Sequence, residues 1–347
     1  MQFNELGKTG IRVSKICLGT MTFGEQNTEA EAHEQISYAV NEGVNFIDTA
    51  EMYPVPPKEQ TQGKTEEYIG TWLKKTGKRK DIVLATKVSG PGMMPYLRGG
   101  VQLIPEQINA ALESSLKRLQ TDYVDLYQIH WPARNTNYFG SLGYQQDNDN
   151  DELDSTMLME DAYACLVKAV EQGKVRHIGI SNETPWGAMQ FQLIAQKNSW
   201  PSMASIQNPY SLLNRTYEVG LAEVSHREQM GLLAYSPLGF GVLSGKYIDS
   251  TPANARLTLY ERFNRYSNLQ GVSATAAYVK LAQESGYSPT QMALAFVNMQ
   301  PFITANIIGA TSMQQLKENI DSIHIKLSSE VLENIELIHQ QHPNPCP

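Results

Sequence analysis

Residues 44–53 read Val44-Asn45-Phe46-Ile47-Asp48-Thr49-Ala50-Glu51-Met52-Tyr53, and the rest of the chain repeats their pattern. The stretch begins as a short, β-rich apolar run, which predicts a buried strand. It ends in a carboxylate, Asp48, and a phenol follows five residues later, at Tyr53. Because a buried acid is costly unless it is paired or used, we expect other polar groups to reach the same place.

Seven further runs of this kind alternate with amphipathic helices. Together with the stretch quoted above, the eight runs in chain order are 15–20, 44–50, 82–88, 124–130, 175–181, 203–208, 231–236 and 305–309. The predicted helices are 29–41, 66–76, 105–119, 160–171, 188–197, 218–226, 272–285, 289–300, 312–321 and 328–339. Strands followed by helices predict a closed (β/α)8 TIM barrel, an α/β fold, with a doubly wound parallel sheet as the alternative.

The whole chain, 1–347, is expected to form one barrel domain, since no linker or low-complexity segment divides it. Residues 1–14 predict an N-terminal β-hairpin, with strands on either side of a turn at residues 7–10. Two stretches, 131–156 and 237–270, are too long for ordinary connections. Because the loops after the strands form the active face of such a barrel, we expect both to lie over a site on the C-terminal face.

Composition excludes several classes of function. The formal net charge of -8 argues against a nucleic-acid partner, which needs a basic face. No basic-plus-apolar leader and no membrane-length apolar run is found, so we expect a cytoplasmic protein without a membrane partner. Cys17, Cys165 and Cys346 lack the spacing of a zinc site or disulfide framework. We predict no metal site, and we assign His339 and His342 to a solvated terminus.

Three neighbouring predicted strands end in chemically useful groups. Asp48 ends the second run, Lys87 lies within the third, and His130 ends the fourth. Neighbouring barrel strands place their C-terminal ends side by side, so the three should meet, with Tyr53 joining them from the second loop. A buried lysine keeps its charge only if a carboxylate faces it, and its charge should then lower the pKa of the phenol. Such a phenol suits proton transfer in carbonyl/alcohol redox chemistry, given a hydride carrier.

Each of these residues also has a purely structural interpretation. Asp48 can cap a turn, Lys87 can serve as an ion-pair partner, and a lone histidine such as His130 is more often a hydrogen-bonded core residue. Tyr53 alone says little in a chain with 17 tyrosines. Their convergence at three adjacent strand ends favours the chemical interpretation.

These motifs resemble the aldo-keto reductase family. The segment from Asp48 to Tyr53, the strand lysine Lys87 and the strand-end His130 are similar to that family's Asp–Tyr–Lys–His tetrad. The resemblance runs from residues 17–21 to residues 318–319, and the segments 50–57 and 207–215 are most similar to the family's bacterial Tas-type branch. It implies that Tyr53 donates the proton, Lys87 lowers the pKa of Tyr53, Asp48 holds Lys87 and His130 positions the substrate carbonyl. It also implies hydride transfer between the nicotinamide of NADP(H) and an aldehyde or ketone, or the alcohol in reverse, without a metal.

The resemblance assigns cofactor contacts to strand ends and loops. For the nicotinamide it implies amide contacts from Ser181, Asn182 and Gln207, and ring stacking by Tyr235. Residues that resemble the pyrophosphate loop are Ser236, Leu238, Gly241 and Lys246, with Arg256 adding charge. Those at the adenosine end are Gly309, Thr311, Gln315, Glu318 and Asn319. From the residues alone, Ser181-Asn182 could instead cap a helix and Tyr235 could be a core aromatic. We expect NADP(H) rather than NAD(H), with Arg256 facing the 2′-phosphate.

The substrate pocket is expected to lie beneath the long loops. Candidate wall residues are Phe23, Met52, Trp131, Tyr138 and Phe139. The expected partner is a small carbonyl or alcohol substrate, and nothing in the pattern assigns an oligomeric state. A second hypothesis is a cofactor-loaded regulatory or partner subunit whose turnover is slow and incidental. It uses the same cofactor loops without requiring catalysis.

Overall fold

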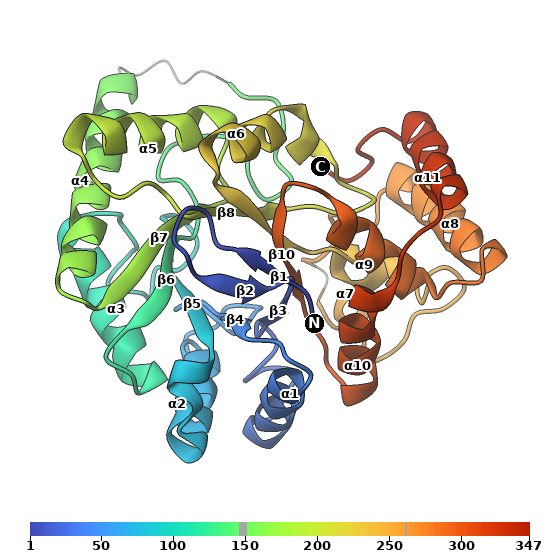
Figure 1. Cartoon of the computed structure of the whole chain (residues 1–347), viewed down its shortest axis with the longest axis horizontal. Coiled ribbons are helices and arrows are strands. Elements are labelled where there is room, and N and C mark those ends of the chain that lie inside the picture. Colours follow the sequence, from blue (N-terminus) through green and yellow to red (C-terminus); the bar gives the residue numbers. More distant parts are fainter. Residues whose placement is uncertain (146–150, 261) are drawn as a thin grey trace.

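Eight parallel strands close into a barrel in the computed structural model, in the order β10-β3-β4-β5-β6-β7-β8-β9 (Figure 1). The structure describes residues 1–145, 151–260 and 262–347, with side chains except at 151–155. The closed barrel confirms the predicted fold and excludes the doubly wound sheet. The barrel strands are β3 (Ile16–Gly19), β4 (Phe46–Asp48), β5 (Val83–Val88), β6 (Val124–Ile129), β7 (Val175–Ser181), β8 (Ser205–Pro209), β9 (Gly231–Tyr235) and β10 (Ile303–Ile308).

Helices surround the barrel and fill the connections. The α-helices are α1 (Glu29–Asn41), α2 (Lys64–Thr76), α3 (Pro105–Leu119), α4 (Asp151–Glu171), α5 (Pro185–Asn198), α6 (Leu221–Glu228), α7 (Arg256–Leu259), α8 (Leu269–Glu284), α9 (Pro289–Met299), α10 (Met313–Asp321) and α11 (Ser329–Gln341). The 3-10 helices are η1 (Lys78–Asp81), η2 (Thr216–Val219), η3 (Gly239–Ser244) and η4 (Ser322–His324).

Both predicted long loops are shorter than expected. Helix α4 begins at Asp151, so the connection after β6 ends before residue 156. The segment 237–270 contains η3, α7 and the start of α8. An acid-rich start suits a helix, because carboxylates near an N-terminus interact favourably with the helix dipole. The last residues of the predicted loop 131–156 therefore form the first turn of α4.

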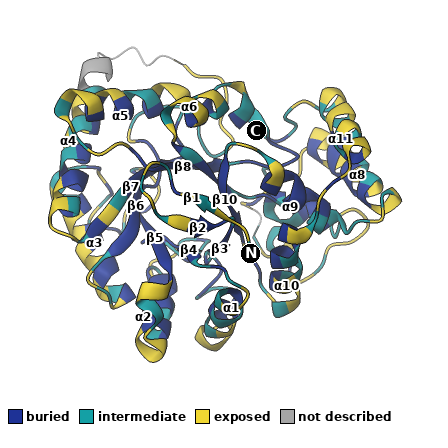
Figure 2. Ribbon diagram, in the orientation of Figure 1, coloured by how far each residue is buried: buried dark blue, intermediate teal, exposed yellow. Residues whose placement is uncertain are grey.

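Side-chain alternation separates two layers of the core. On β4, β5 and β6 the apolar residues Phe46, Val83, Ala85 and Leu126 fill the barrel interior. Intervening residues such as Ile47 and Leu84 face the surrounding helices. Figure 2 shows the result, with buried strands inside and helices that are exposed on their outer faces. Since side chains alternate along a strand, the next inward positions after this apolar layer are Asp48, Lys87 and Gln128.

The predicted N-terminal hairpin is present and covers the amino ends of the barrel strands. Strands β1 (Phe3–Glu5) and β2 (Arg12–Ser14) pair antiparallel and lie across the barrel in Figure 1. Leu6 and Val13 join the interior apolar cluster. Asn4 Nδ2 donates hydrogen bonds to two backbone carbonyls at the start of β10, both at 3.0 Å. Gly7 lies so close to the Ala204 carbonyl that a Cβ there would be 2.4 Å from its oxygen.

The cysteines are all buried, as expected for core residues: Cys17, Cys165 and Cys346. A search of the described helices for a segment long and apolar enough to cross a bilayer finds none.

Candidate active site

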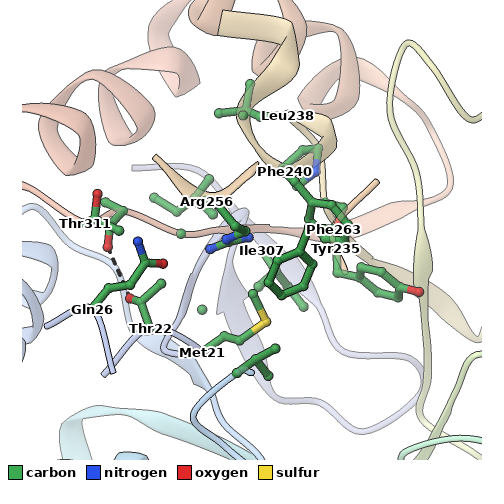
Figure 3. A pocket seen from close by; sticks show the side chains of 18 of the residues that line it. Met21, Thr22, Gln26, Tyr235, Leu238, Phe240, Arg256, Phe263, Ile307 and Thr311 are labelled. Atoms are coloured by element: carbon green, nitrogen blue, oxygen red, sulfur yellow. Dashed lines mark hydrogen bonds between the residues drawn. The ribbon is translucent and has the colours of Figure 1, made fainter. Parts of the chain in front are cut away.

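A pocket of about 730 Å³ opens at the carboxyl ends of the barrel strands. Seven strand ends contribute to its lining, through Gly19, Asp48, His130, Asn182, Gln207, Tyr235 and Ile308. The segment 237–270 forms one wall, as Figure 3 shows for Leu238, Phe240, Arg256 and Phe263. This is the face on which (β/α)8 barrels carry their active sites.

The predicted tetrad meets at the floor of this pocket. Lys87 Nζ donates hydrogen bonds to Asp48 Oδ2 and to the Thr49 carbonyl, both at 2.7 Å. The same ammonium lies 5.1 Å from the centre of the Tyr53 ring. The imidazole of His130 lies 5.9 Å from that ring, edge to face. Asp48, Tyr53 and His130 line the pocket, whereas Lys87 is fully buried beneath them.

Strand register explains the convergence. Asp48 pairs with Ala85 on β5, and Lys87 follows two residues later on the same inward face. Lys87 is in register with Gln128 on β6, and His130 follows two residues beyond Gln128. Three neighbouring strands thus present an acid, an ammonium and an imidazole above one apolar layer.

The pKa of Tyr53 moves in the direction opposite to our prediction. Burial raises the pKa of the Tyr53 phenol well above its ordinary value, the carboxylate of Asp48 raises it further, and Arg256 partly opposes both. The prediction that Lys87 would lower this pKa is wrong as a net effect. Desolvation disfavours the phenolate, and the ammonium of Lys87 is already compensated by Asp48 at 2.7 Å.

Burial also fixes the state of the imidazole. It lowers the pKa of His130 well below the ordinary value, and the charge of Lys87 adds to this shift. At neutral pH the site therefore holds a neutral imidazole beside a protonated phenol. A neutral imidazole carries one N–H donor, and a protonated phenol carries one acidic O–H.

Hydrogen bonds link the tetrad to the predicted nicotinamide residues. Gln207 Nε2 donates to Asp48 Oδ1 at 2.8 Å. Asn182 Nδ2 donates to the His130 carbonyl at 2.8 Å, and the Tyr235 hydroxyl donates to Asn182 Oδ1 at 2.6 Å. Ser181 lies behind the pocket surface and donates to the Gln207 carbonyl at 2.7 Å. Three of the four residues thus line the pocket, and Ser181 supports them from behind.

The helix-cap alternative for Ser181-Asn182 does not apply, because the N-cap of α5 is Thr184. Asn182 instead occupies the left-handed region, with φ of 54°. Asparagine is among the residues that tolerate this conformation best. The turn directs its amide back across the strand ends towards His130 and Tyr235.

The glycine-rich loop after β9 has the form of an anion cradle. Phe240 and Gly241 have positive φ values, 57° and 94°, which turn the backbone sharply inside η3. A Cβ on Gly241 would lie 3.1 Å from Lys246 Nζ, so the glycine admits the ammonium against the backbone. Burial lowers the pKa of Lys246, and the neighbouring Arg256 lowers it further. An anion placed against both cations would relieve that repulsion, so these residues fit a diphosphate.

The opposite end of the pocket is formed by the start of α10. All five predicted adenosine-end residues line it: Gly309, Thr311, Gln315, Glu318 and Asn319. Ser312 caps the helix by accepting a hydrogen bond from the Gln315 N–H at 3.3 Å. Gln315 Oε1 in turn accepts from the Thr311 N–H at 2.9 Å. Figure 3 shows Arg256 reaching into the pocket between this end and Tyr235.

Three of the five predicted wall residues are wrong. Met52 and Phe139 line the pocket, but Phe23, Trp131 and Tyr138 do not. Trp131 is completely buried, and its indole N–H donates to the Pro91 carbonyl at 2.9 Å. This packing requires Gly90, where a Cβ would lie 2.4 Å from the indole ring.

Several lining residues were missed. Met21, Thr22 and Gln26 follow β3, and Figure 3 shows Gln26 directed towards Thr311. Gln26 Oε1 is buried and has no hydrogen-bond partner among the described residues. The sequence did contain a signal for these residues, because a polar, Thr-rich loop directly follows the first predicted strand. Arg262 and Arg265 line the pocket as well, on the segment where we singled out only Lys246 and Arg256.

The structure is thus a (β/α)8 barrel with a pocket at the carboxyl ends of its strands. The floor of this pocket holds the Asp48–Lys87 ion pair, the phenol of Tyr53 and the imidazole of His130. Comparison with known proteins identifies the same class. The profile of the Aldo/keto reductase family matches residues 15–340, and the chain belongs to this family.

Similar proteins extend the comparison over the whole chain. The chain is 52% identical to "Protein tas" of Escherichia coli (strain K12), over all of both chains. It is 34% identical to "Uncharacterized oxidoreductase YrpG" of Bacillus subtilis (strain 168), over 99% of this chain and 97% of that protein. An "Aldo-keto reductase" of Babesia bovis is 37% identical over 69% of this chain and 88% of that protein.

Proposed function

We propose that the protein is an NADP(H)-dependent aldo-keto reductase that reduces aldehydes or ketones, or oxidises the alcohols in reverse, with Tyr53 as general acid. The observation that carries this proposal is the buried Asp48–Lys87 ion pair beside Tyr53 at the pocket floor. Removing such a pair from water is expensive, and a barrel core could use apolar residues there instead. Its position under a pocket-lining phenol supports a chemical role.

Tyr53 supplies the proton that the carbonyl oxygen of the substrate receives. The Tyr53 phenol is protonated at neutral pH, which is the state that a proton donor to a carbonyl oxygen needs; its raised pKa also makes it a weaker acid than a free phenol. The neutral imidazole of His130 can donate a second hydrogen bond to the same oxygen and so orient the carbonyl. Lys87 lies near the ring on which negative charge develops as the proton leaves. Burial also disfavours the phenolate that alcohol oxidation requires.

The remaining lining residues support a dinucleotide cofactor. When bound, the nicotinamide of NADPH supplies the hydride. Asn182 and Gln207 would hold its carboxamide, and Tyr235 would pack on its ring. Ser236, Leu238, Gly241 and Lys246 would surround the diphosphate, and the α10 end would hold the adenosine. Arg256, which has no carboxylate within 4.0 Å among the described residues, supports NADP(H) over NAD(H).

The test replaces Tyr53 by Phe and follows NADPH oxidation with 4-nitrobenzaldehyde. Loss of a general acid should lower kcat by roughly 100-fold or more. NADPH binding, followed by protein fluorescence, should be unchanged. Tyr287→Phe is the matched control, because that hydroxyl donates to the Lys326 carbonyl near the surface.

Undiminished turnover in Tyr53→Phe would remove the proton-donor assignment. A wild-type protein that binds NADPH but reduces nothing in a broad panel of aldehydes and ketones would support the regulatory or partner-subunit function instead.

A further inference from the structure

The pocket holds more positive charge than the proposed cofactor contacts use. Four cationic side chains line it, namely Lys246, Arg256, Arg262 and Arg265. Within the described residues, which leave out Glu261, none of the four lies within 4.0 Å of a carboxylate. The lining acids do not compensate them. Asp48 is paired with Lys87, and Glu318 accepts a hydrogen bond from Ser288.

The four cations all belong to the segment 237–270, which forms one wall of the pocket. Lys246 lies against Gly241 in the glycine-rich loop, and Arg256 reaches into the middle of the pocket (Figure 3). Arg262 and Arg265 flank Phe263, which Figure 3 places near Tyr235. Arg265 Cζ lies 6.0 Å from the centre of the Phe240 ring, and Arg256 Cζ lies 5.7 Å from the same ring, so these two arginines are neighbours on this wall.

Of Arg262 and Arg265, Arg265 is the better placed to bind a ligand inside the pocket. Its charge and its side-chain hydrogen bonding oppose the burial-driven rise in the pKa of both Tyr235 and Tyr266, so the guanidinium lies beside both phenols. On its other side it touches the loop after β6, where a Cβ on Gly140 would lie 2.8 Å from Arg265 Nε. Arg265 Nη1 has no exposed surface and no hydrogen-bond partner among the described residues. An unsatisfied buried guanidinium nitrogen is costly, and a ligand oxygen would satisfy it.

Part of the pocket wall is apolar. Met52, Val55, Met93 and Phe139 line the same pocket, from the loops after β4, β5 and β6. Methionine side chains adapt to varied apolar shapes. Arg262 is exposed, and its charge partly opposes the burial-driven rise in the pKa of Tyr96, a residue packed on the same apolar cluster. It therefore lies at the entrance, above the apolar wall.

We propose that the preferred substrates are carbonyl compounds with an apolar body and a carboxylate, which Arg265 binds inside the pocket while Arg262 attracts it at the entrance. A planar guanidinium matches the two oxygens of a carboxylate. The inference rests on the proposed reductase function and names the substrate class for that site.

The kinetic test compares 4-carboxybenzaldehyde with its methyl ester. The ester group withdraws electrons more strongly, so intrinsic reactivity favours the ester, and a preference for the acid must come from binding. Wild-type protein should show the higher kcat/KM for the acid. Arg265→Gln should lower the ratio of kcat/KM for the acid to kcat/KM for the ester, or for 4-nitrobenzaldehyde, by about 10- to 100-fold. Arg265→Lys should retain part of the preference, because it keeps the charge without the planar fork.

Two controls separate the carboxylate site from other effects. Arg227→Gln alters an exposed arginine on α6 that pairs with Glu223, and it should change neither substrate. Arg262→Gln should reduce the preference by only a few-fold, and high salt should abolish its effect because exposed charges are screened. NADPH affinity, measured by fluorescence, should be the same in Arg265→Gln and wild type.

A binding measurement keeps this inference separate from the reductase proposal. Calorimetry should detect 4-methylbenzoate binding to the NADP⁺-saturated protein, and the signal should be lost in Arg265→Gln. If the wild type reduces no aldehyde, the calorimetric result still decides whether the carboxylate site exists. An ester preferred over the acid, equal losses for both in Arg265→Gln, or 4-methylbenzoate binding that Arg265→Gln leaves intact would each overturn the inference.

Discussion

Replacing Lys87 by Met tests the central ion pair directly. Methionine has nearly the length of lysine but no charge. Lys87 has no exposed surface and Asp48 is 2% exposed, and their charged atoms lie 2.7 Å apart. Without the ammonium, the Asp48 carboxylate keeps two neutral donors among the described residues, Gln207 Nε2 at 2.8 Å and Gln128 Nε2 at 3.4 Å. Breaking a buried ion pair in this way lowers the free energy of unfolding by about 3–5 kcal/mol.

The free energy of unfolding in urea, followed by tryptophan fluorescence, gives the magnitude. Lys87→Met should lower it by about 3–5 kcal/mol, and Asp48→Asn with Lys87→Met should recover at least about 2 kcal/mol, because no unpaired charge then remains. Lys197→Met is the control. It breaks an exposed pair with Glu160 and should cost under about 1 kcal/mol. The reasoning fails if Lys87→Met is as stable as the control, or if the double variant is no more stable than Lys87→Met.

Three further predictions concern stability. The pKa of His130 is lowered by burial, so below pH 6.5 the unfolded chain gains a proton that the folded chain does not. The wild type should then lose stability relative to His130→Gln by up to about 1.4 kcal/mol per pH unit in urea titrations, and parallel curves for the two proteins would contradict this. Gly70→Ala should lower the free energy of unfolding in urea by about 1–3 kcal/mol, because the new Cβ on α2 would lie 2.1 Å from the Arg118 carbonyl oxygen. Alanine otherwise favours helices, so a rise in stability would show that this contact relaxes freely. Thr28→Ala should cost about 1 kcal/mol in thermal or urea unfolding by removing the capping box with Glu31, and Thr28→Ser should restore the loss.

The sequence predicted regular elements best where local signals mark their ends. The bounds of α1 and α3 agree with prediction, since a Thr–Glu capping box begins one and Pro105 begins the other. The strand β7 also matches in both bounds. By contrast, α7 is only four residues long and lies in a segment rich in turn residues, so no periodicity could reveal it.

The candidate site was predictable where strand ends determine position and unpredictable where burial or loop packing does. Alternation and register placed Asp48, Lys87 and His130 together without any knowledge of side-chain packing. The direction of the Tyr53 pKa shift depends on desolvation, which a sequence does not measure. Trp131 directly follows His130, yet it turns into the protein interior because Gly90 leaves room for its ring. Arg265 acquires its importance from contacts with Tyr235 and Gly140, which are distant in sequence.

The hairpin that covers the amino ends of the strands has a consequence for access to the pocket. It closes the amino end of the barrel, so a cofactor or substrate reaches the floor of the pocket from the carboxyl end. In the function proposed above, the dinucleotide and the carbonyl compound must therefore share this one opening.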